Sequence, residues 1–250
     1  MKSSCQYHPF IILGTARTGS TMLWSYLNSH PDILCLRGVY GPKNKINFGK
    51  FYGDLPEEYH SSELIKLRNE RPIEFLENYV WKEYAQPFKA VGFKYFYDHD
   101  RHLIHKEEVL SYFKSNSAIK ILHLKRDNLL ATLFSYKRAL THQQWTNAKA
   151  GFLTSITIQE CNDYFNQIIY NQKRLDELFS DRILQVSYDN LLQATEPTLL
   201  EVLDFIGVKA ISLITETIKN RETKLADSIL NYSELKTHFK STEYAKYFNE

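Results

Sequence analysis

One arginine, two glycines and several hydroxyl side chains lie close together between Gly14 and Thr21. Glycine lets the backbone approach a ligand closely, and hydroxyl and backbone N–H groups donate hydrogen bonds to an anion. Arg17 adds a positive charge that suits the oxygen atoms of a phosphate group. These residue types at this spacing therefore predict a phosphate-binding turn. An ordinary turn between a strand and a helix is the alternative explanation.

The spacing can be compared with the nucleotide P-loop, G-x-x-x-x-G-K-[ST]. Gly14 and Gly19 have the required separation, but Ser20 occupies the position of the lysine. That lysine holds the β- and γ-phosphates in kinases and ATPases. Arg17 is the only cation in the loop, three positions earlier than the lysine would be. The sequence thus argues against ATP hydrolysis and favours a different phosphorylated ligand.

The elements on either side of this turn have the order that binds phosphate. Residues 10–13 form a short apolar run typical of a buried strand, and residues 20–28 have helical spacing that Pro31 ends. The apolar face of this helix consists of Met22, Leu23, Tyr26 and Leu27. The start of a helix carries free N–H groups and a partial positive charge, so a strand–turn–helix unit positions an anion there.

A second unit of the same kind follows at residues 118–138. The apolar run at 118–124 predicts a strand, Lys125 and Arg126 come directly after it, and a helix containing Ser135 follows. Cations at such a junction suit a second anionic group. A surface Lys–Arg pair that merely ends a strand is the alternative.

The rest of the chain alternates between the two kinds of element. Further strands are expected at residues 33–36, 89–95 and 183–188, and further helices at 54–88, 161–179 and 197–206, with another near the end of the chain. This alternation predicts an α/β fold, a P-loop-like and mainly parallel sheet with helices on both faces. A length of 250 residues suits one domain over 1–250.

The first turn also resembles a known family. The string G-T-A-R-T-G-S-T-M-L, followed by N-S-H-P-D-I, is similar to the 5′-phosphosulfate loop of sulfotransferases that use 3′-phosphoadenosine 5′-phosphosulfate (PAPS). The likeness is greatest to the bacterial glycolipid and carbohydrate branch, which includes nodulation-factor and trehalose sulfotransferases. The family pattern R-[ST]-G-[ST]-[ST] is matched by Arg17, Thr18, Gly19, Ser20 and Thr21, and the resemblance implies that these residues and Met22 bind the donor.

The resemblance assigns the second unit to the 3′-phosphate of the donor. It implies that Arg126 and Ser135 bind this group, although they are nine positions apart and eight is common in the family. Tyr188, in a block resembling Y-E-D-L…F-L-G-L, matches an aromatic residue near the adenine ring. The basic segment 217–225 could lie over the 3′-phosphate through Arg221, or could be an ordinary solvated surface.

The same resemblance predicts the chemistry. A sulfuryl group moves from PAPS to a hydroxyl of a carbohydrate or glycolipid, leaving 3′-phosphoadenosine 5′-phosphate (PAP), and no metal is required. Arg17 is expected to stabilise the leaving oxygen, and Lys94 to assist if its strand end faces the loop. Lys94 and His99 fit the family pattern G-F-K-x-x-x-x-H. A nucleotide-binding module without turnover and an unusual small-molecule kinase are the alternatives.

The family's usual proton acceptor is a glutamate, and none is present at Gly38–Val39. Another residue must therefore serve as the base. Histidine can accept a proton near neutral pH, and His99 follows a strand into a loop, where catalytic groups gather in parallel sheets. His30 is expected to anchor a turn and His123 to pack within the sheet. A structural role for His99, ordering its loop through a neighbouring aspartate, is the alternative.

Composition limits the remaining possibilities. The net charge of +2 gives no general attraction to nucleic acid. Three widely spaced cysteines are typical of free thiols in a reducing compartment rather than of a disulfide framework. No apolar run reaches the length of a membrane span, and residues 1–10 lack the apolar core of a signal peptide. A cytoplasmic enzyme is expected.

Overall fold

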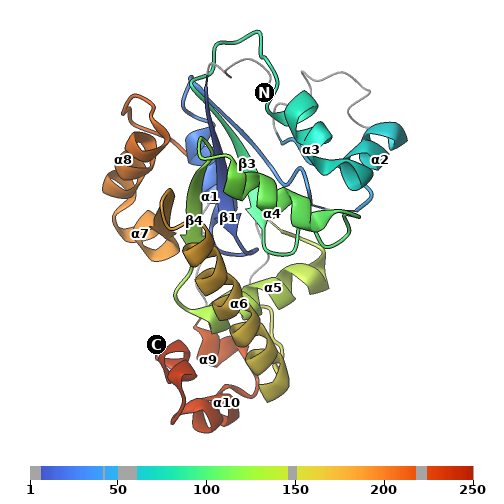
Figure 1. The fold of residues 1–250 in the computed structure, drawn as a ribbon. Helices are drawn as coiled ribbons and strands as arrows, with labels where there is room; N and C mark the ends of the chain where they lie inside the picture. The colour runs from blue at the N-terminus through green and yellow to red at the C-terminus, as the bar shows by residue number, and fades with distance from the viewer. Residues whose placement is uncertain (1–6, 42, 50–60, 146–150, 218–223, 250) are drawn as a thin grey trace.

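The computed structural model describes residues 7–41, 43–49, 61–145, 151–217 and 224–249 (Figure 1). A sheet of five strands forms its centre, in the order β2-β3-β1-β4-β5. The strands are β1 (His8–Gly14), β2 (Ile33–Leu36), β3 (Ala90–Phe96), β4 (Lys120–Lys125) and β5 (Ile183–Ser187). All four pairings are parallel, so the carboxyl ends of the five strands lie at the same edge. The predicted parallel α/β fold is confirmed.

Twelve helical segments accompany the sheet in the described part of the chain. They are α1 (Ser20–Leu27), α2 (Ser62–Glu70), α3 (Pro72–Phe75), the π-helical turn η3 (Leu76–Val80), α4 (Lys106–Ser115), α5 (Leu129–His142), α6 (Ile158–Leu178), α7 (Tyr188–Gln193), α8 (Thr195–Ile206), α9 (Leu225–Ser228), α10 (Tyr232–Phe239) and the 3-10 helix η4 (Glu243–Phe248).

Three regions differ from the expectation. The helical stretch expected at residues 54–88 is divided into α2, α3 and η3 and ends at Val80, and its first residues, up to 60, lie outside the described ranges. Helix α4 is not predicted from the sequence because it buries only Val109 and Phe113 and has no side-chain cap at its start. Strand β5 ends at Ser187 instead of continuing through Tyr188. The Ser187 hydroxyl accepts hydrogen bonds from the N–H groups of Asp189 and Asn190, and this cap starts α7 at Tyr188.

Alternating side chains of the strands bury both faces of the sheet. In β1, Ile11 and Leu13 join an apolar cluster with residues of α2, α3, α4 and the end of α6. Phe10 and Ile12 join a second cluster with α1, α7 and α8. Figure 1 shows these helices on opposite sides of the strands. Helices therefore cover both faces, as a buried parallel sheet requires.

A third apolar cluster lies beyond the carboxyl ends of the strands, at the bottom of Figure 1. It joins α5 and the first half of α6 to α9, α10 and η4. The side-chain amide of Asn231 fastens the segment before α6 through two hydrogen bonds, one from the Ile156 N–H and one to the Ile156 carbonyl. This third cluster holds α5 against the edge where parallel sheets bind their ligands.

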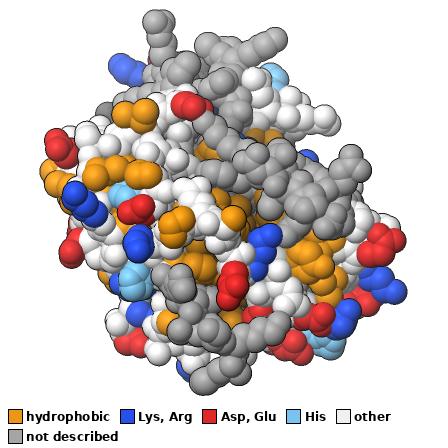
Figure 2. Space-filling model, turned by 90° about the horizontal axis from the view of Figure 1, so that it is seen from above, with side chains coloured by type: hydrophobic (Ala, Val, Ile, Leu, Met, Phe, Trp, Pro, Cys, Tyr) orange, Lys and Arg blue, Asp and Glu red, His pale blue; other side chains and the backbone are white. Residues whose placement is uncertain are grey.

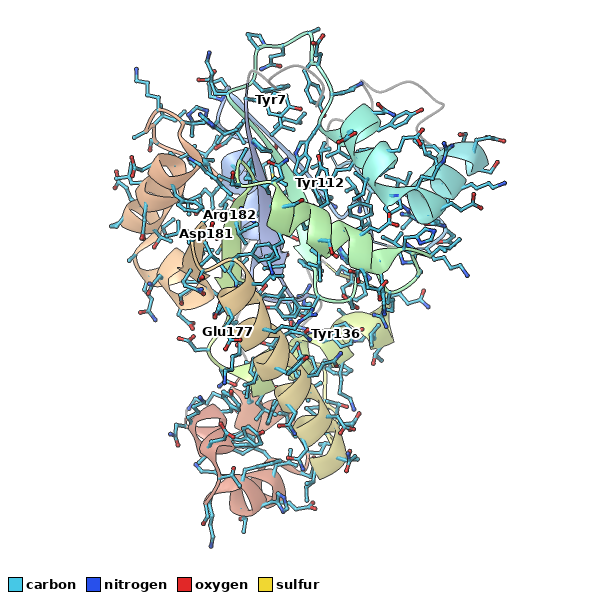
Figure 3. The ribbon with its side chains drawn as sticks, viewed as in Figure 1. Tyr7, Tyr112, Tyr136, Glu177, Asp181 and Arg182 are labelled. Atoms are coloured by element: carbon cyan, nitrogen blue, oxygen red, sulfur yellow. The ribbon has the colours of Figure 1, made fainter. Side chains whose placement is uncertain are left out.

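The opposite end of the sheet, where the strands begin, faces the viewer in Figure 2. Acidic and basic side chains are interspersed on the described part of this surface, with hydrophobic side chains between them. Figure 3 labels Tyr7 near this end and Tyr136, on α5, near the other, and the two residues mark the opposite ends of the sheet.

Candidate active site

The loop between β1 and α1 has the backbone of an anion-binding turn. Arg17 and Gly19 both adopt left-handed conformations, with φ of 70° and 84°. Gly19 is the N-cap of α1, no side chain caps the helix, and its first turn contains no acidic residue. The free N–H groups at the start of α1 are therefore available to an anion.

Glycine is required at both ends of this loop by close contacts. A Cβ atom on Gly14 would lie 2.6 Å from the carbonyl oxygen of Leu124 in β4, and one on Gly19 would lie 2.5 Å from the ring of Tyr188. The Thr18 hydroxyl donates to the Thr15 carbonyl at 2.8 Å and fixes the turn from inside. The Tyr188 ring consequently lies directly against the loop.

The two predicted phosphate-binding units meet at Arg17. Its Nε donates a hydrogen bond of 2.9 Å to the hydroxyl oxygen of Ser135, which is 118 positions away in the chain. Its Nη1 donates to the backbone carbonyl of Trp145, just after the end of α5. The structure thus brings the first turn and α5 into direct contact through one guanidinium.

Three arginines gather at this contact. Burial lowers the pKa of Arg17, and the charges of Arg138 and Arg126 lower it further. Burial also lowers the pKa of Arg138, again with a contribution from Arg126. In the described ranges, no carboxylate forms an ion pair with any of the three. A partly buried excess of positive charge is favourable only when an anion neutralises it.

Tyr188 and Arg126 lie together beside the first turn. The Arg126 guanidinium carbon is 4.7 Å from the centroid of the Tyr188 ring, close enough for a cation–π interaction. The same ring packs closely against Gly19. The sequence predicts separate roles for these two residues, and the structure shows that they are neighbours.

Lys94 approaches the same loop from β3. Its side chain is buried, and its Nζ lies 3.5 Å from the hydroxyl oxygen of Thr21. Burial lowers the pKa of Lys94 to about 8, and the nearby charge of Arg37 is the next largest cause. The strand end that carries Lys94 therefore faces the first turn of α1, as an assisting role for this lysine requires.

Arg37 was not among the residues expected at the site. It follows β2, its guanidinium carbon lies 4.5 Å from the centroid of the Trp24 ring, and its Nε is buried without a partner. The signal that could have revealed it is its position, because a cation directly after a strand also marks Arg126. The carboxyl ends of β2, β3 and β4 thus each contribute a cation.

His99 lies beside Gly38, the position near which the family's glutamate is expected. A Cβ atom on Gly38 would lie 2.7 Å from Cε1 of His99, and the His99 ring centroid is 4.5 Å from that of Phe96. Burial lowers the pKa of His99 to about 4; the charge of Lys94 lowers it further, against an opposing contribution from Asp98. The imidazole is therefore neutral at pH 7, and its Nδ1 is buried without a partner.

The aspartates beside His99 have partners of their own. Asp98 pairs with Arg101, and Asp100 accepts a hydrogen bond of 2.5 Å from the Tyr95 hydroxyl. Neither bonds Nδ1 of His99, which has no partner. The structural alternative, in which a neighbouring aspartate uses His99 to order the loop, finds no support in these contacts.

His30 and His123, the other two histidines considered as bases, have contacts that fit the structural roles predicted for them. Nδ1 of His30 accepts from the N–H of Asp32 at 3.0 Å, and its Nε2 lies 2.9 Å from the carbonyl oxygen of Lys209. His123 is fully buried in β4, where its two ring nitrogens lie 2.7 Å from the Tyr97 hydroxyl and the Asp176 carboxylate. Both are occupied away from the cationic cluster.

Three further residues complete the comparison with the expected site. Met22 packs in part against the apolar cluster of α1 and α8, and its N–H bonds the Gly19 carbonyl at 2.9 Å. Ser20 is buried in the first turn of α1. Arg221 lies outside the described residues. Arg138 was missed, although it lies one helical turn after Ser135 on α5.

A metal-binding group and a membrane-spanning helix are both absent from the described residues. They contain no group of three or more histidine, cysteine, aspartate or glutamate side chains that could hold a metal ion. Within the same ranges, no helix combines the length and hydropathy needed to cross a membrane.

Comparison with known proteins shows the family and the fold of the chain. The chain is 28% identical to nodulation protein H of Rhizobium tropici over 252 residues, which covers 96% of this chain and 92% of the relative. It is 25% identical to nodulation protein H of Rhizobium meliloti over 248 residues, covering 96% and 94%. In fold it is similar to a crystal structure of a sulfotransferase from Alicyclobacillus acidocaldarius, with a TM-score of 0.50, 15% identity, and 92% and 90% of the two chains covered. A model of the sulfotransferase family matches residues 9–212, and the chain therefore belongs to the sulfotransferase family and is an enzyme of that class.

Proposed function

We propose that this sulfotransferase uses PAPS as its donor and a hydroxyl group of a carbohydrate or glycolipid as its acceptor. One observation carries the choice of donor, namely the 2.9 Å bond between Nε of Arg17 and the Ser135 hydroxyl. This bond joins two anion-binding elements within the length of one side chain. Two phosphate groups held so close together suit a single ribose that carries them on its 3′ and 5′ positions, as PAPS and PAP do.

The proposed acceptor rests on the relatives of the chain and on one aromatic side chain near Arg17. The loop Arg17–Thr21 resembles the glycolipid and carbohydrate branch, and the relatives found are named nodulation protein H. The side chain of Trp145 is about half exposed, and its backbone carbonyl accepts a hydrogen bond from the Arg17 guanidinium. Aromatic rings of this kind stack on sugars. A glycan or glycolipid acceptor is consistent with these features.

In the proposed reaction, the acceptor oxygen forms a bond to sulfur as the bond from sulfur to the 5′-phosphate oxygen breaks, and the acceptor proton goes to a base. Negative charge grows on the departing phosphate oxygen. Donors already aimed at that position stabilise it, because they need no rearrangement during the reaction. The N–H groups at the start of α1, Arg17 and Lys94 are such donors.

His99 is the proposed base. It is neutral at pH 7, so a ring nitrogen is free to accept a proton, and it lies next to Lys94 and Gly38. Burial is the largest cause of its pKa of about 4, and the positive charge of Lys94 lowers the pKa further. A doubly phosphorylated donor neutralises that charge and raises the pKa of both His99 and Lys94.

The proposed donor is tested by thermal unfolding with PAP or with ATP and magnesium. A ligand at 100 times its Kd that binds only the folded state adds about 2.7 kcal/mol to the free energy of unfolding. For a chain of this size, the expected rise in Tm is roughly 5 to 10 °C with PAP and much less with ATP. Equal or greater stabilisation by ATP with magnesium would favour the kinase alternative.

Sulfate transfer from PAPS across a panel of glycans and glycolipids tests the acceptor. Transfer to at least one hydroxyl-bearing member is expected. Binding of PAP without transfer to any member would favour a nucleotide-binding module without turnover.

A further inference from the structure

Arg138 is a charged side chain near the first turn that the proposed reaction does not use. It lies in the middle of α5, its side chain is only 9% exposed, and its Nε is buried without a hydrogen-bond partner. No hydrogen bond or ion pair joins its guanidinium to any residue of the described ranges. A buried cation without a partner lowers the stability of a folded protein, so its presence calls for an explanation.

The surroundings of Arg138 increase this cost. Arg17 and Arg126 are close enough for their charges to act on it or on each other, and all three are cations. The Phe134 ring, with its centroid 5.9 Å from the guanidinium carbon, gives a long cation–π contact but carries no negative charge that could balance the three cations. No carboxylate of the described residues pairs with this group, so an added anion is the neutralising partner that fits it.

The position of Arg138 identifies which anion. It lies three residues after Ser135, so the two side chains share one face of α5. Ser135 contacts Arg17, and the first turn holds the 5′ end of the donor in the proposed function. Arg138 therefore approaches the donor from the α5 side, where the other phosphate is expected.

The position of Arg126 allows a second arginine to bind a phosphate beside Ser135. It was expected to bind the 3′-phosphate with Ser135, at a separation one residue longer than is common in the family. In the structure its guanidinium lies over the Tyr188 ring, 4.7 Å from the ring centroid. Arg126 thus supplies positive charge beside Tyr188, whose ring packs against the first turn.

We propose that Arg138 binds the 3′-phosphate of the donor together with Ser135, and so makes the enzyme select a bisphosphorylated nucleoside over one with a 5′-phosphate alone. This inference rests on the proposed donor. The planar guanidinium presents paired N–H donors that match two phosphate oxygens. Arg138 is a binding residue in this role and takes no part in the transfer of the sulfuryl group.

The test measures the affinities of PAP and of AMP, which lacks the 3′-phosphate, by calorimetry for the full chain and for Arg138→Met. The wild type is expected to prefer PAP. In Arg138→Met, PAP affinity should fall roughly 10- to 100-fold, the loss of a hydrogen-bonded charge pair, while AMP affinity changes less than about threefold. Arg138→Lys should fall between the two, because it keeps the charge but loses the paired donors.

Lys137→Met is the matched control. It removes the same charge from the neighbouring position on α5, but Lys137 faces Glu160, with which it forms an ion pair. Its PAP affinity should equal that of the wild type within about twofold, so a general loss of positive charge is separated from a loss of contact.

Stability separates a binding role from a structural one. Since Arg138 has no hydrogen-bond or ion-pair partner among the described residues, Arg138→Met should unfold without ligand at the same temperature as the wild type or up to about 4 °C higher. A fall of several degrees, with PAP and AMP weakened alike, would assign Arg138 a structural role. An unchanged preference for PAP over AMP in Arg138→Met would overturn this inference alone, whereas a wild type that does not bind PAP would overturn the proposed donor.

Discussion

At the scale of single residues, Arg17 and Ser135 act as one unit. The sequence assigns Arg17 to the 5′ end of the donor and Ser135 to the 3′ end, yet the structure joins them by a hydrogen bond of 2.9 Å. Residues in direct contact do not contribute independently to binding or to turnover. Removal of either side chain therefore takes this hydrogen bond away from the other.

This contact predicts a coupled effect. Arg17→Ala should lower kcat more than it lowers PAP affinity, because Arg17 faces charge that grows only during transfer. Ser135→Ala should mainly weaken PAP, by about 1 to 3 kcal/mol. The double variant should then show a coupling free energy of roughly 0.5 to 3 kcal/mol between the two single effects. Strict additivity, or a variant of Arg17 that loses PAP affinity but keeps its kcat, would contradict this assignment.

His99 gives the second prediction at this scale. Both His99→Ala and His99→Gln should lose most of the turnover, because neither alanine nor the amide of glutamine can accept the acceptor proton at this place. PAP affinity and Tm should stay close to those of the wild type. His30→Gln is a useful comparison, since His30 bonds the backbone at Asp32 and Lys209 and should affect stability instead. Near-normal rates in His99→Gln would transfer the role of base to another group.

At the scale of elements, the turn between β1 and α1 depends on how closely α7 packs against it. Because Ser187 caps α7, Tyr188 stands at the start of a helix, and its ring fills the space where Gly19 would carry a side chain. The glycine serves two purposes at this point. Its φ of 84° suits a residue without Cβ, and its missing side chain admits the ring.

A pair of alanine variants separates these two purposes. Gly19→Ala and Gly207→Ala both place Cβ on a left-handed residue, with φ of 84° and 81°, so each should lower the free energy of unfolding by about 1 to 2 kcal/mol. Gly207 ends α8 and lies against His8, at the opposite end of the sheet from the site. Only Gly19→Ala should also weaken PAP by more than about tenfold, because it displaces Tyr188. Equal PAP affinities in the two variants would exclude a role for this packing in donor binding.

At the scale of the whole molecule, three histidines are held neutral by the fold. Burial is the largest cause that lowers the pKa of His99, His102 and His123 to about 4 each. In the unfolded chain a histidine titrates near its ordinary pKa of about 6.5. Between these two values the unfolded state binds more protons than the folded state, so stability rises with pH and is lost as the pH falls below about 6.5.

Acid should therefore destabilise the protein before its carboxylates titrate. His99 and His123 each contribute a slope of up to about 1.4 kcal/mol per pH unit in the free energy of unfolding between pH 6.5 and 4, and His102 contributes less because solvent screens its half-buried ring. Denaturant unfolding at several pH values measures this slope, and His102→Gln should reduce it by less than the share of one proton. A free energy of unfolding that stays constant from pH 7 to pH 5 would contradict the burial of these rings as neutral groups.

Local sequence was sufficient for several features of this protein. The strand, glycine turn and helix at residues 10–28, the second cationic turn at Lys125–Arg126 and the α/β alternation are all encoded in residues that are neighbours in the chain. Their periodicity and turn chemistry depend on local backbone preferences, which need no knowledge of the fold. The prediction of a parallel sheet with helices on both faces follows from these local patterns and is confirmed.

Contacts between distant segments were decided only by the tertiary structure. Arg17 and Ser135, 118 positions apart, meet because the sheet order β2-β3-β1-β4-β5 places the turn after β1 beside the turn after β4. The same order brings Lys94 to Thr21, and packing of α5 against this edge brings Arg138 to the site without a partner. No local pattern distinguishes Arg138 from a solvated surface arginine. Its burial results from the way the whole chain packs, and a sequence read position by position contains no measure of that.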